Sequence, residues 1–286
     1  MVHESSRPDR PAVADRSSVR SRDVSDLFVP RAGGVLSADI AVPEHERQVR
    51  FYSRVLGTGE DPLWREDLMN SRGMPIIGLG ARGPEHAALP LQWMPHVQVA
   101  DVAAGVERAL ERGGRELMHA KDAGGTSQWA VLLDPNGAAF GIIPVVSADT
   151  LAPGEDVARE SAAPGRIAWL DLTVSDAAAT RDFYRQVVGW SVQEVEMEED
   201  GRPYADYVML GGDGKPAAGV CHARGVNLGL PPVWMIYLPV GDLAESLHRV
   251  EAEGGQVVKA ARGADGEYAY AAVRDPVGAC FALVPG

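Results

Sequence analysis

The chain has 286 residues, about twice the usual size of a domain, and this length predicts two domains. Hydrophobic residues make up 45% and charged residues 23%, a composition typical of a folded globular protein. The net charge is -13, and no cluster of basic residues offsets it. An acidic surface repels phosphate backbones and anionic lipids, and no apolar stretch approaches the roughly 20 residues that span a bilayer. We therefore expect neither nucleic acid nor a membrane as a partner.

The first 28 residues are rich in Arg, Ser, Asp and Pro and lack the apolar segment of a secretory signal. This composition predicts a disordered tail. The sequence contains two cysteines, Cys221 and Cys280. Two thiols are too few for a disulfide framework or a thiolate zinc site, so we expect a reduced, cytoplasmic protein.

Strand and helix patterns alternate along the first half of the chain, with period two in the strands and helical spacing of Val, Phe, Tyr and Leu in the first helix. In chain order the predicted elements are a strand over 36–42, a helix that ends at Gly57, a strand over 75–79, a strand over 94–99, a helix over 102–112, and strands over 129–133 and 139–145. An Asp-Pro-Asn-Gly turn separates the last two strands and predicts a hairpin.

The second half repeats the first. Three pairs of segments align, namely 36–57 with 169–189, 93–114 with 234–255, and 134–137 with 275–278. The first pair shares Phe-Tyr-x-x-Val-x-Gly, the second shares a leading Trp-Met and a closing Gly-Gly, and the third shares Asp-Pro-x-Gly. Two unrelated domains would not keep these motifs in one order, so the chain is an internal duplication.

Each copy consists of two strand–helix–strands units. The sequence therefore predicts an α+β protein of four βαβββ modules, paired into two domains. The predicted boundaries are a disordered tail over 1–28, a first domain over 29–147, a linker over 148–164 and a second domain over 165–286.

The order and spacing of these motifs resemble the vicinal oxygen chelate superfamily, which includes glyoxalases, bleomycin resistance proteins and extradiol dioxygenases. The tandem arrangement is similar to the two-domain proteins of this family that are common in actinobacteria. The resemblance implies that each pair of modules forms a curved sheet enclosing a cup, one cup in each glyoxalase-like domain.

In metal-dependent members of that family, inward-facing His and Glu side chains hold a divalent ion in the cup. The resemblance places the corresponding positions at Ser37, Met94, Gly141, Trp169, Met235 and Ala282. None of these side chains supplies the imidazole or carboxylate that such an ion requires, and His222 alone does not make a site. We expect no metal and no cofactor, and we do not expect glyoxalase I or extradiol dioxygenase activity.

Four catalytic candidates lie two residues beyond those positions. Because strand side chains alternate faces, Asp39 and His96 would point into the first cup, and Asp171 and Tyr237 into the second. A carboxyl group facing an imidazole or a phenol across an apolar cup is suited to proton transfer. The alternative is structural, because buried Asp residues present in both copies could accept hydrogen bonds that join the modules.

Several large side chains are candidates for binding a flat, apolar ligand by stacking and contact. They are Trp93, Met94, Trp129, Trp169, Trp234, Met235 and Tyr270. Packing in the core is the alternative role for about half of the aromatic residues among them. Phe51, Tyr52 and their equivalents in the second copy are expected to be core residues, because they lie at helical spacing with Val and Leu.

Three functions are consistent with these residues. The first is a metal-independent enzyme that uses acid–base chemistry (cyclisation, isomerisation, dehydration or ring opening) on a hydrophobic, aromatic or polyketide-like molecule of secondary metabolism. The second is a protein that binds and sequesters a drug without changing it. The third is a scaffold that binds another protein. With four modules, one chain can complete both cups, so we expect a monomer or a homodimer.

Overall fold

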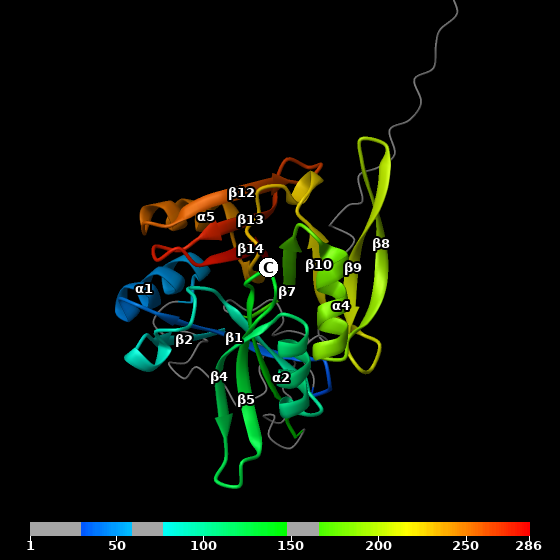
Figure 1. Ribbon diagram of the computed structural model, residues 1–286. Coiled ribbons are helices and arrows are strands. Elements are labelled where there is room, and N and C mark those ends of the chain that lie inside the picture. Colours follow the sequence, from blue (N-terminus) through cyan, green and yellow to red (C-terminus); the bar gives the residue numbers. More distant parts are fainter. Residues whose placement is uncertain (1–29, 59–76, 148–165) are drawn as a thin grey trace, which may run out of the picture.

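The computed structural model describes residues 30–58, 77–147 and 166–286 (Figure 1). The tail predicted over 1–28 and the linker predicted over 148–164 lie outside the described residues. The described chain forms two curved mixed sheets of six and eight strands, with helices against one face of each, as the α+β prediction requires.

The first sheet has the strand order β2-β1-β3-β6-β5-β4. Its domain contains β1 (Val35–Val42), α1 (His45–Leu56), β2 (Ile77–Ala81), the short 3-10 helix η3 (Pro84–His86), β3 (Met94–Val99), α2 (Val102–Glu111), β4 (Arg115–Lys121), β5 (Ser127–Leu133) and β6 (Ala139–Pro144).

The second sheet has the order β12-β13-β14-β11-β7-β10-β9-β8. Its domain contains β7 (Trp169–Val174), α4 (Ala177–Val187), β8 (Ser191–Glu199), β9 (Arg202–Leu210), β10 (Pro216–His222), the short 3-10 helix η5 (Gly225–Asn227), β11 (Trp234–Val240), α5 (Leu243–Ala252), β12 (Gln256–Arg262), β13 (Tyr268–Arg274) and β14 (Cys280–Pro285).

Three of the four modules show the predicted βαβββ order in full, beginning at β3, β7 and β11. The module that begins at β1 shows a strand, a helix and one further strand, and its other two predicted strands would fall within residues 59–76, outside the described part. In each domain the leading strands of the two modules pair antiparallel, β1 with β3 and β7 with β11. This pairing places the two modules of a domain around a local two-fold axis.

Local chemistry explains where the helices begin and end. The carboxylates of Asp101, Asp176 and Asp242 accept a hydrogen bond from the third backbone N–H of α2, α4 and α5, which satisfies a donor that the helix itself leaves unpaired. Gly57 ends α1 with φ of 69°, a left-handed conformation that glycine adopts without steric cost. The second helix stops at Glu111, one residue before the predicted end, because Arg112 serves as its C-cap.

Two faces of each sheet have different roles. One face joins the helices in a main core that is shared by both domains. The opposite face carries a smaller cluster that contains no helix residue. We call these the first-cup cluster, formed by Ala41, Leu89, Met94, Val131 and Ala139, and the second-cup cluster, formed by Leu230, Met235, Tyr237, Tyr270, Ala272, Cys280 and Ala282.

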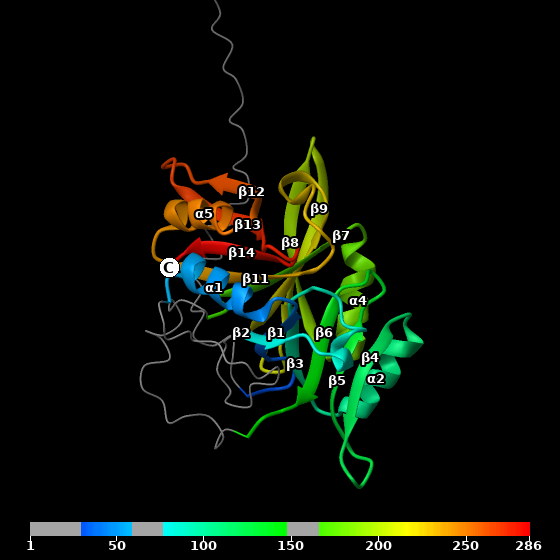
Figure 2. The same ribbon diagram turned by 90° about the vertical axis from the view of Figure 1, so that its left-hand side faces the viewer.

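The helices pack across the domain boundary. Helix α1 of the first domain lies against α5 of the second, and α2 of the first lies against α4 of the second (Figures 1 and 2). An ion pair between Arg54 and Glu253, with its nearest atoms 2.5 Å apart, adds a polar contact between α1 and α5. The helices of each domain therefore pack against helices of the other domain as well as against their own sheet.

A buried chain of hydrogen bonds connects the repeated motifs of the two copies. Trp93 Nε1 donates to the Tyr52 hydroxyl at 3.2 Å, and that hydroxyl donates to Asp275 Oδ2 at 3.0 Å. Asp275 belongs to the Asp-Pro-x-Gly turn of the other domain. Its Oδ1 accepts backbone N–H groups at 2.8 and 3.0 Å, so one carboxylate both closes its own turn and joins the domains.

The reciprocal chain has the same composition. Trp234 Nε1 donates to the Tyr184 hydroxyl at 2.9 Å, and Tyr184 donates to Asp134 Oδ2 at 3.4 Å. We call the two sets the Trp-Tyr-Asp triads. Burial raises the pKa of both Asp134 and Asp275 and of both tyrosines, because each charged form would leave water.

We predict that Tyr52→Phe lowers the free energy of unfolding by about 2 kcal/mol, because the variant leaves two buried polar partners without their hydroxyl. Tyr184→Phe should have an effect of similar size. Urea unfolding followed by tryptophan fluorescence measures both. Tyr268→Phe, on a half-buried tyrosine of β13, is the matched control and should change stability by less than about 0.5 kcal/mol. Equal effects at all three positions would contradict the role of the triads.

Candidate active site

The four predicted catalytic residues lie on the cup faces of the sheets, opposite the main core. On β1 and β3 the core side is occupied by residues such as Ile40 and Val97, and Asp39 and His96 alternate with them. On β7 and β11 the same alternation puts Asp171 and Tyr237 on the cup face. The period-two argument therefore assigned the faces correctly.

The first cup brings Asp39 and His96 together. His96 Nδ1 lies 3.4 Å from Asp39 Oδ2 and 3.2 Å from the Ser37 hydroxyl. Asp39 and His96 are only 1% and 3% exposed, and Ser37 is fully buried. Burial lowers the pKa of His96 to about 4, so the imidazole is neutral at pH 7. Both members of this pair are shielded from solvent.

The glycine at position 141 explains how the imidazole fits. Gly141 pairs with His96 across β3 and β6, and a Cβ atom built at Gly141 would overlap the His96 ring. Position 141 is one of the metal-ligand positions that the family resemblance identified. In this chain the His96 ring occupies the space that a side chain at position 141 would need.

The second cup presents its carboxylate differently. Trp169 Nε1 donates to Asp171 Oδ1 at 2.8 Å, and both residues are partly exposed. Gly219 pairs with Asp171 across β7 and β10, and a Cβ atom at Gly219 would overlap Asp171 Oδ1. The indole N–H thus holds the carboxylate, Gly219 leaves the space that it occupies, and Asp171 as a residue is partly exposed.

Aromatic and sulfur-containing side chains surround Asp171. Met235 is directly opposite Asp171 in the antiparallel pair β7–β11, and Tyr237 is opposite Trp169. Asp171 and Tyr237 are therefore diagonal neighbours on one face of the sheet. The ring of Tyr237 lies 6.4 Å from that of Tyr270, centroid to centroid. This arrangement places one partly exposed carboxylate beside an apolar cluster that contains two buried tyrosines.

The predicted ligand-contacting residues divide into two groups. Met94, Trp129, Trp169, Met235 and Tyr270 belong to the cup clusters or pack against them. Trp93 and Trp234 belong to the main core, where their indoles complete the triads, so they line neither cup. The reason is the alternation of the strands, because each of these tryptophans precedes a methionine that faces the cup.

The residues at the metal-ligand positions do not fit a divalent ion. Ser37, Met94, Trp169 and Met235 offer no carboxylate or imidazole, and Gly141 and Ala282 offer no ligand atom at all. Within residues 30–58, 77–147 and 166–286, no three His, Cys, Asp or Glu side chains are grouped so that they could hold a metal ion.

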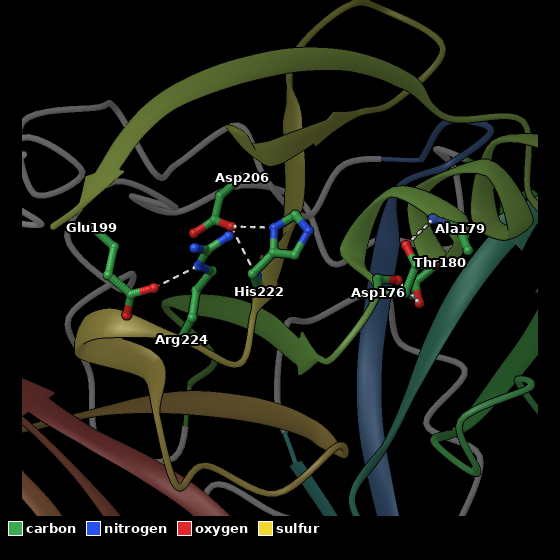
Figure 3. A network of polar contacts seen from close by, with 7 residues as sticks. All are labelled: Asp176, Ala179, Thr180, Glu199, Asp206, His222 and Arg224. Atoms are coloured by element: carbon green, nitrogen blue, oxygen red, sulfur yellow. Dashed lines mark hydrogen bonds and ion pairs between the residues drawn. The ribbon is translucent and has the colours of Figure 1, made fainter. Parts of the chain in front are cut away.

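A polar network on β8, β9 and β10 was not recognised from the sequence (Figure 3). Asp206 Oδ1 accepts the backbone N–H of His222 at 2.8 Å and lies 3.1 Å from His222 Nδ1. Arg224 donates to Glu199 at 2.9 Å. Its guanidinium also stacks over the Tyr204 ring. His222, the isolated metal candidate, is thus engaged with Asp206. Residues 16 and 25 positions apart meet here, and no motif in the sequence indicates such pairs.

Sequence profiles match both copies of the repeat. The Glyoxalase-like domain matches residues 36–143, and the Glyoxalase/Bleomycin resistance protein/Dioxygenase superfamily matches residues 166–283. The chain belongs to this superfamily. It carries two of its domains in tandem, which confirms the resemblance inferred from the repeated motifs.

Two relatives differ in how much of the chain they match. The provisionally named glyoxylase CFP32 of Mycobacterium tuberculosis is 25% identical over 254 residues, which cover 86% of this chain and 92% of CFP32. Anthracycline biosynthesis protein DnrV of Streptomyces peucetius is 32% identical over 133 residues, which cover 42% of this chain and 47% of DnrV.

Among solved structures, homoprotocatechuate 2,3-dioxygenase of Brevibacterium fuscum has the same fold, with a TM-score of 0.52 at 15% identity over 91% of this chain and 73% of the dioxygenase.

No helix within the described residues has the length and apolar character needed to cross a bilayer.

We predict that His96 makes stability fall on acidification. An unfolded histidine has a pKa near 6.5, and the folded value is about 4, so the unfolded state binds more protons between these pH values. Stability should therefore decrease as the pH falls from about 6.5 to about 4, by up to about 3 kcal/mol, and His96→Gln should remove much of this loss.

Urea unfolding at pH 7 and pH 4.5 measures the effect. His248→Gln, which changes an exposed histidine of α5, is the control and should keep the wild-type difference between the two pH values. The same pH dependence in wild type and His96→Gln would show that His96 is not the responsible group.

Proposed function

We propose that the chain is an enzyme that binds a flat, hydrophobic, aromatic or polyketide-like molecule in the second cup and transfers a proton within it. Asp171 is the proton acceptor and donor, and no metal ion takes part. The observation that carries this proposal is the partly exposed Asp171 carboxylate on an otherwise apolar, aromatic surface.

The difference between the two cups supports the choice of the second. Asp39 and His96 are almost fully buried, so a substrate atom would have to displace packed side chains to reach either of them. Asp171 and Trp169 are partly exposed and are continuous with the second-cup cluster. A catalytic base must come within hydrogen-bonding distance of the proton it removes, and the partial exposure of Asp171 supports the choice of the second cup.

The residues present suggest one type of step. Asp171 removes a proton from a carbon next to a carbonyl group, and the electron pair moves to the carbonyl oxygen as an enolate. In this proposal the phenol of Tyr237, the diagonal neighbour of Asp171, donates a hydrogen bond to that oxygen, and Asp171 then returns the proton at another carbon. The atoms balance without an oxidant or a second substrate, so the net reaction is an isomerisation. Cyclisation or dehydration could follow from the same enolate.

The relatives are compatible with a small-molecule ligand of this kind. DnrV of Streptomyces peucetius and DauV of another Streptomyces strain are both named as anthracycline biosynthesis proteins, and anthracyclines are flat polyketides. The partly exposed indole of Trp169 suits fused rings because aromatic faces offer a large contact area.

A second candidate function is sequestration of a drug. The same carboxylate and aromatic residues would hold a cationic, planar molecule without changing it, and the net charge of -13 favours cations. The difference between the two functions is turnover, and the following experiment measures turnover and binding separately.

We predict that the protein accelerates hydrogen–deuterium exchange at the acidic methylene carbon of anthrone, a tricyclic ketone. In deuterated buffer, Asp171→Asn should lower this rate by about 100-fold or more, because the amide is not a base. The dissociation constant, measured by calorimetry, should change by less than about threefold, since size and shape are kept.

Asp122→Asn, on the exposed β4–β5 turn, is the matched control, and this variant should accelerate the exchange of anthrone as much as the wild type does. Binding without exchange in the wild type would favour sequestration. Loss of exchange in Asp39→Asn but not in Asp171→Asn would move the active site to the first cup. Neither binding nor exchange would reject the proposed function.

A further inference from the structure

A positive side chain lies on the same row of the second sheet as Asp171. Met235 is opposite Asp171 in the pair β7–β11, and Arg274 is opposite Cys280 in the pair β13–β14. The parallel register of β11 and β14, in which Tyr237 is beside Ala282, brings Met235 beside Cys280. Asp171 and Arg274 are thus three strand spacings apart, or about 14 Å, with Met235 and Cys280 between them.

A pocket of about 410 Å³ lies at the Arg274 end of this row. Val233, Arg274 and Cys280 of the second domain line it, together with Leu91 and Gln92 of the first. Val233 and Cys280 also belong to the second-cup cluster or pack against it, so the pocket continues the cup toward the domain boundary.

The first domain has a hydrogen-bonded glutamine at the position equivalent to Val233. There Gln92 Nε2 donates to the carbonyl of Gly137 at 3.2 Å, and Gln92 Oε1 accepts the N–H of Ala139 at 3.0 Å. The residue 141 positions later is Val233, which makes neither bond, and the pocket lies beside it.

The charge differs as well. The residue equivalent to Arg274 is Leu133, a half-buried side chain packed against the first-cup cluster. Arg274 is exposed, and its Nη1 makes one long hydrogen bond, 3.4 Å, to Gln256 Oε1. Two differences between the copies, Val for Gln and Arg for Leu, therefore lie on the wall of the pocket, and the second places a guanidinium there.

We propose that Arg274 binds a carboxylate of the second-cup ligand, so that the substrate class is flat aromatic acids whose ring system extends from Arg274 toward Asp171. This inference rests on the proposed function, because it assigns a ligand class to the same cup. A guanidinium pairs with a carboxylate through two parallel N–H···O bonds, which fixes the orientation of the rings as well as adding affinity. The reacting carbon is then presented to Asp171, at the end of the cup away from the charge.

The test compares two probes that differ only in charge, anthraquinone-2-carboxylate and anthraquinone-2-carboxamide, with the full chain at low and high salt. The wild type should bind the acid about tenfold more tightly than the amide, and high salt should reduce this preference. Arg274→Leu, which introduces the side chain found in the first domain, should abolish the preference while the affinity for the amide changes less than about twofold. Arg274→Gln should do the same.

Arg50→Gln, on an exposed arginine of α1, is the control for net charge and should keep the tenfold preference. Trp169→Ala should weaken the binding of both probes equally, and this result would show that both probes bind in the second cup. Equal affinity of the wild type for acid and amide, both weakened by Trp169→Ala, would overturn the role of Arg274 and leave the proposed function intact. A preference that persists in Arg274→Leu would also overturn it. No binding of either probe to the wild type would reject the cup as the site for this class.

Discussion

The two Trp-Tyr-Asp triads are the interaction on which the rest of the structure depends. In each, the tyrosine comes from the first helix of one domain and the aspartate from the last turn of the other. The partners are 223 and 50 residues apart in the sequence, so each triad closes only when both domains are in place. This explains why the Phe-Tyr, Trp-Met and Asp-Pro-x-Gly motifs are present in both copies. Each copy needs the tyrosine of the other for its aspartate, and loss of one member would leave buried polar groups without partners.

The reciprocal triads join the domains on the core faces of the sheets, and the cup faces take no part in them. The first cup is occupied by its own side chains, because His96 takes the space that Gly141 leaves and Asp39 lies against the imidazole. In the second cup the equivalent carboxylate accepts an indole N–H and stays partly exposed. The duplicated aspartate thus has a different environment in each copy. Asp39 lies against the imidazole of His96, and Asp171 accepts a hydrogen bond from the indole of Trp169.

Much of this architecture could be predicted from the sequence, and the errors have identifiable causes. The repeat and the period-two alternation were sufficient to place Asp39 and His96 on one face, and the structure brings them within 3.4 Å. The same alternation would have excluded Trp93 and Trp234 from the cups, since each is adjacent to a methionine that faces inward. The bond between Tyr52 and Asp275 could not be predicted, because nothing local in either motif indicates its partner. Nor could the sequence predict that Asp39 is buried and Asp171 partly exposed, since the two residues have the same position in equivalent strands.

The differences between the copies that bear on the proposed site lie on the cup face of the second sheet or at its edge. Where the first domain has Gln92, Leu133 and His96, the second has Val233, Arg274 and Tyr237. The first set makes hydrogen bonds or packs on the cup face of the first sheet; in the second set Val233 and Arg274 line a pocket, and Tyr237 is a diagonal neighbour of Asp171. These changes lie along one row or its immediate neighbours in the second sheet, between β7 and β13. Relaxed constraint on a merely structural face would scatter polar and apolar exchanges without order. Here they place a guanidinium at one end of a row of apolar side chains and a partly exposed carboxylate at the other, as the proposed binding of a molecule with an acidic group and a separate reacting carbon requires.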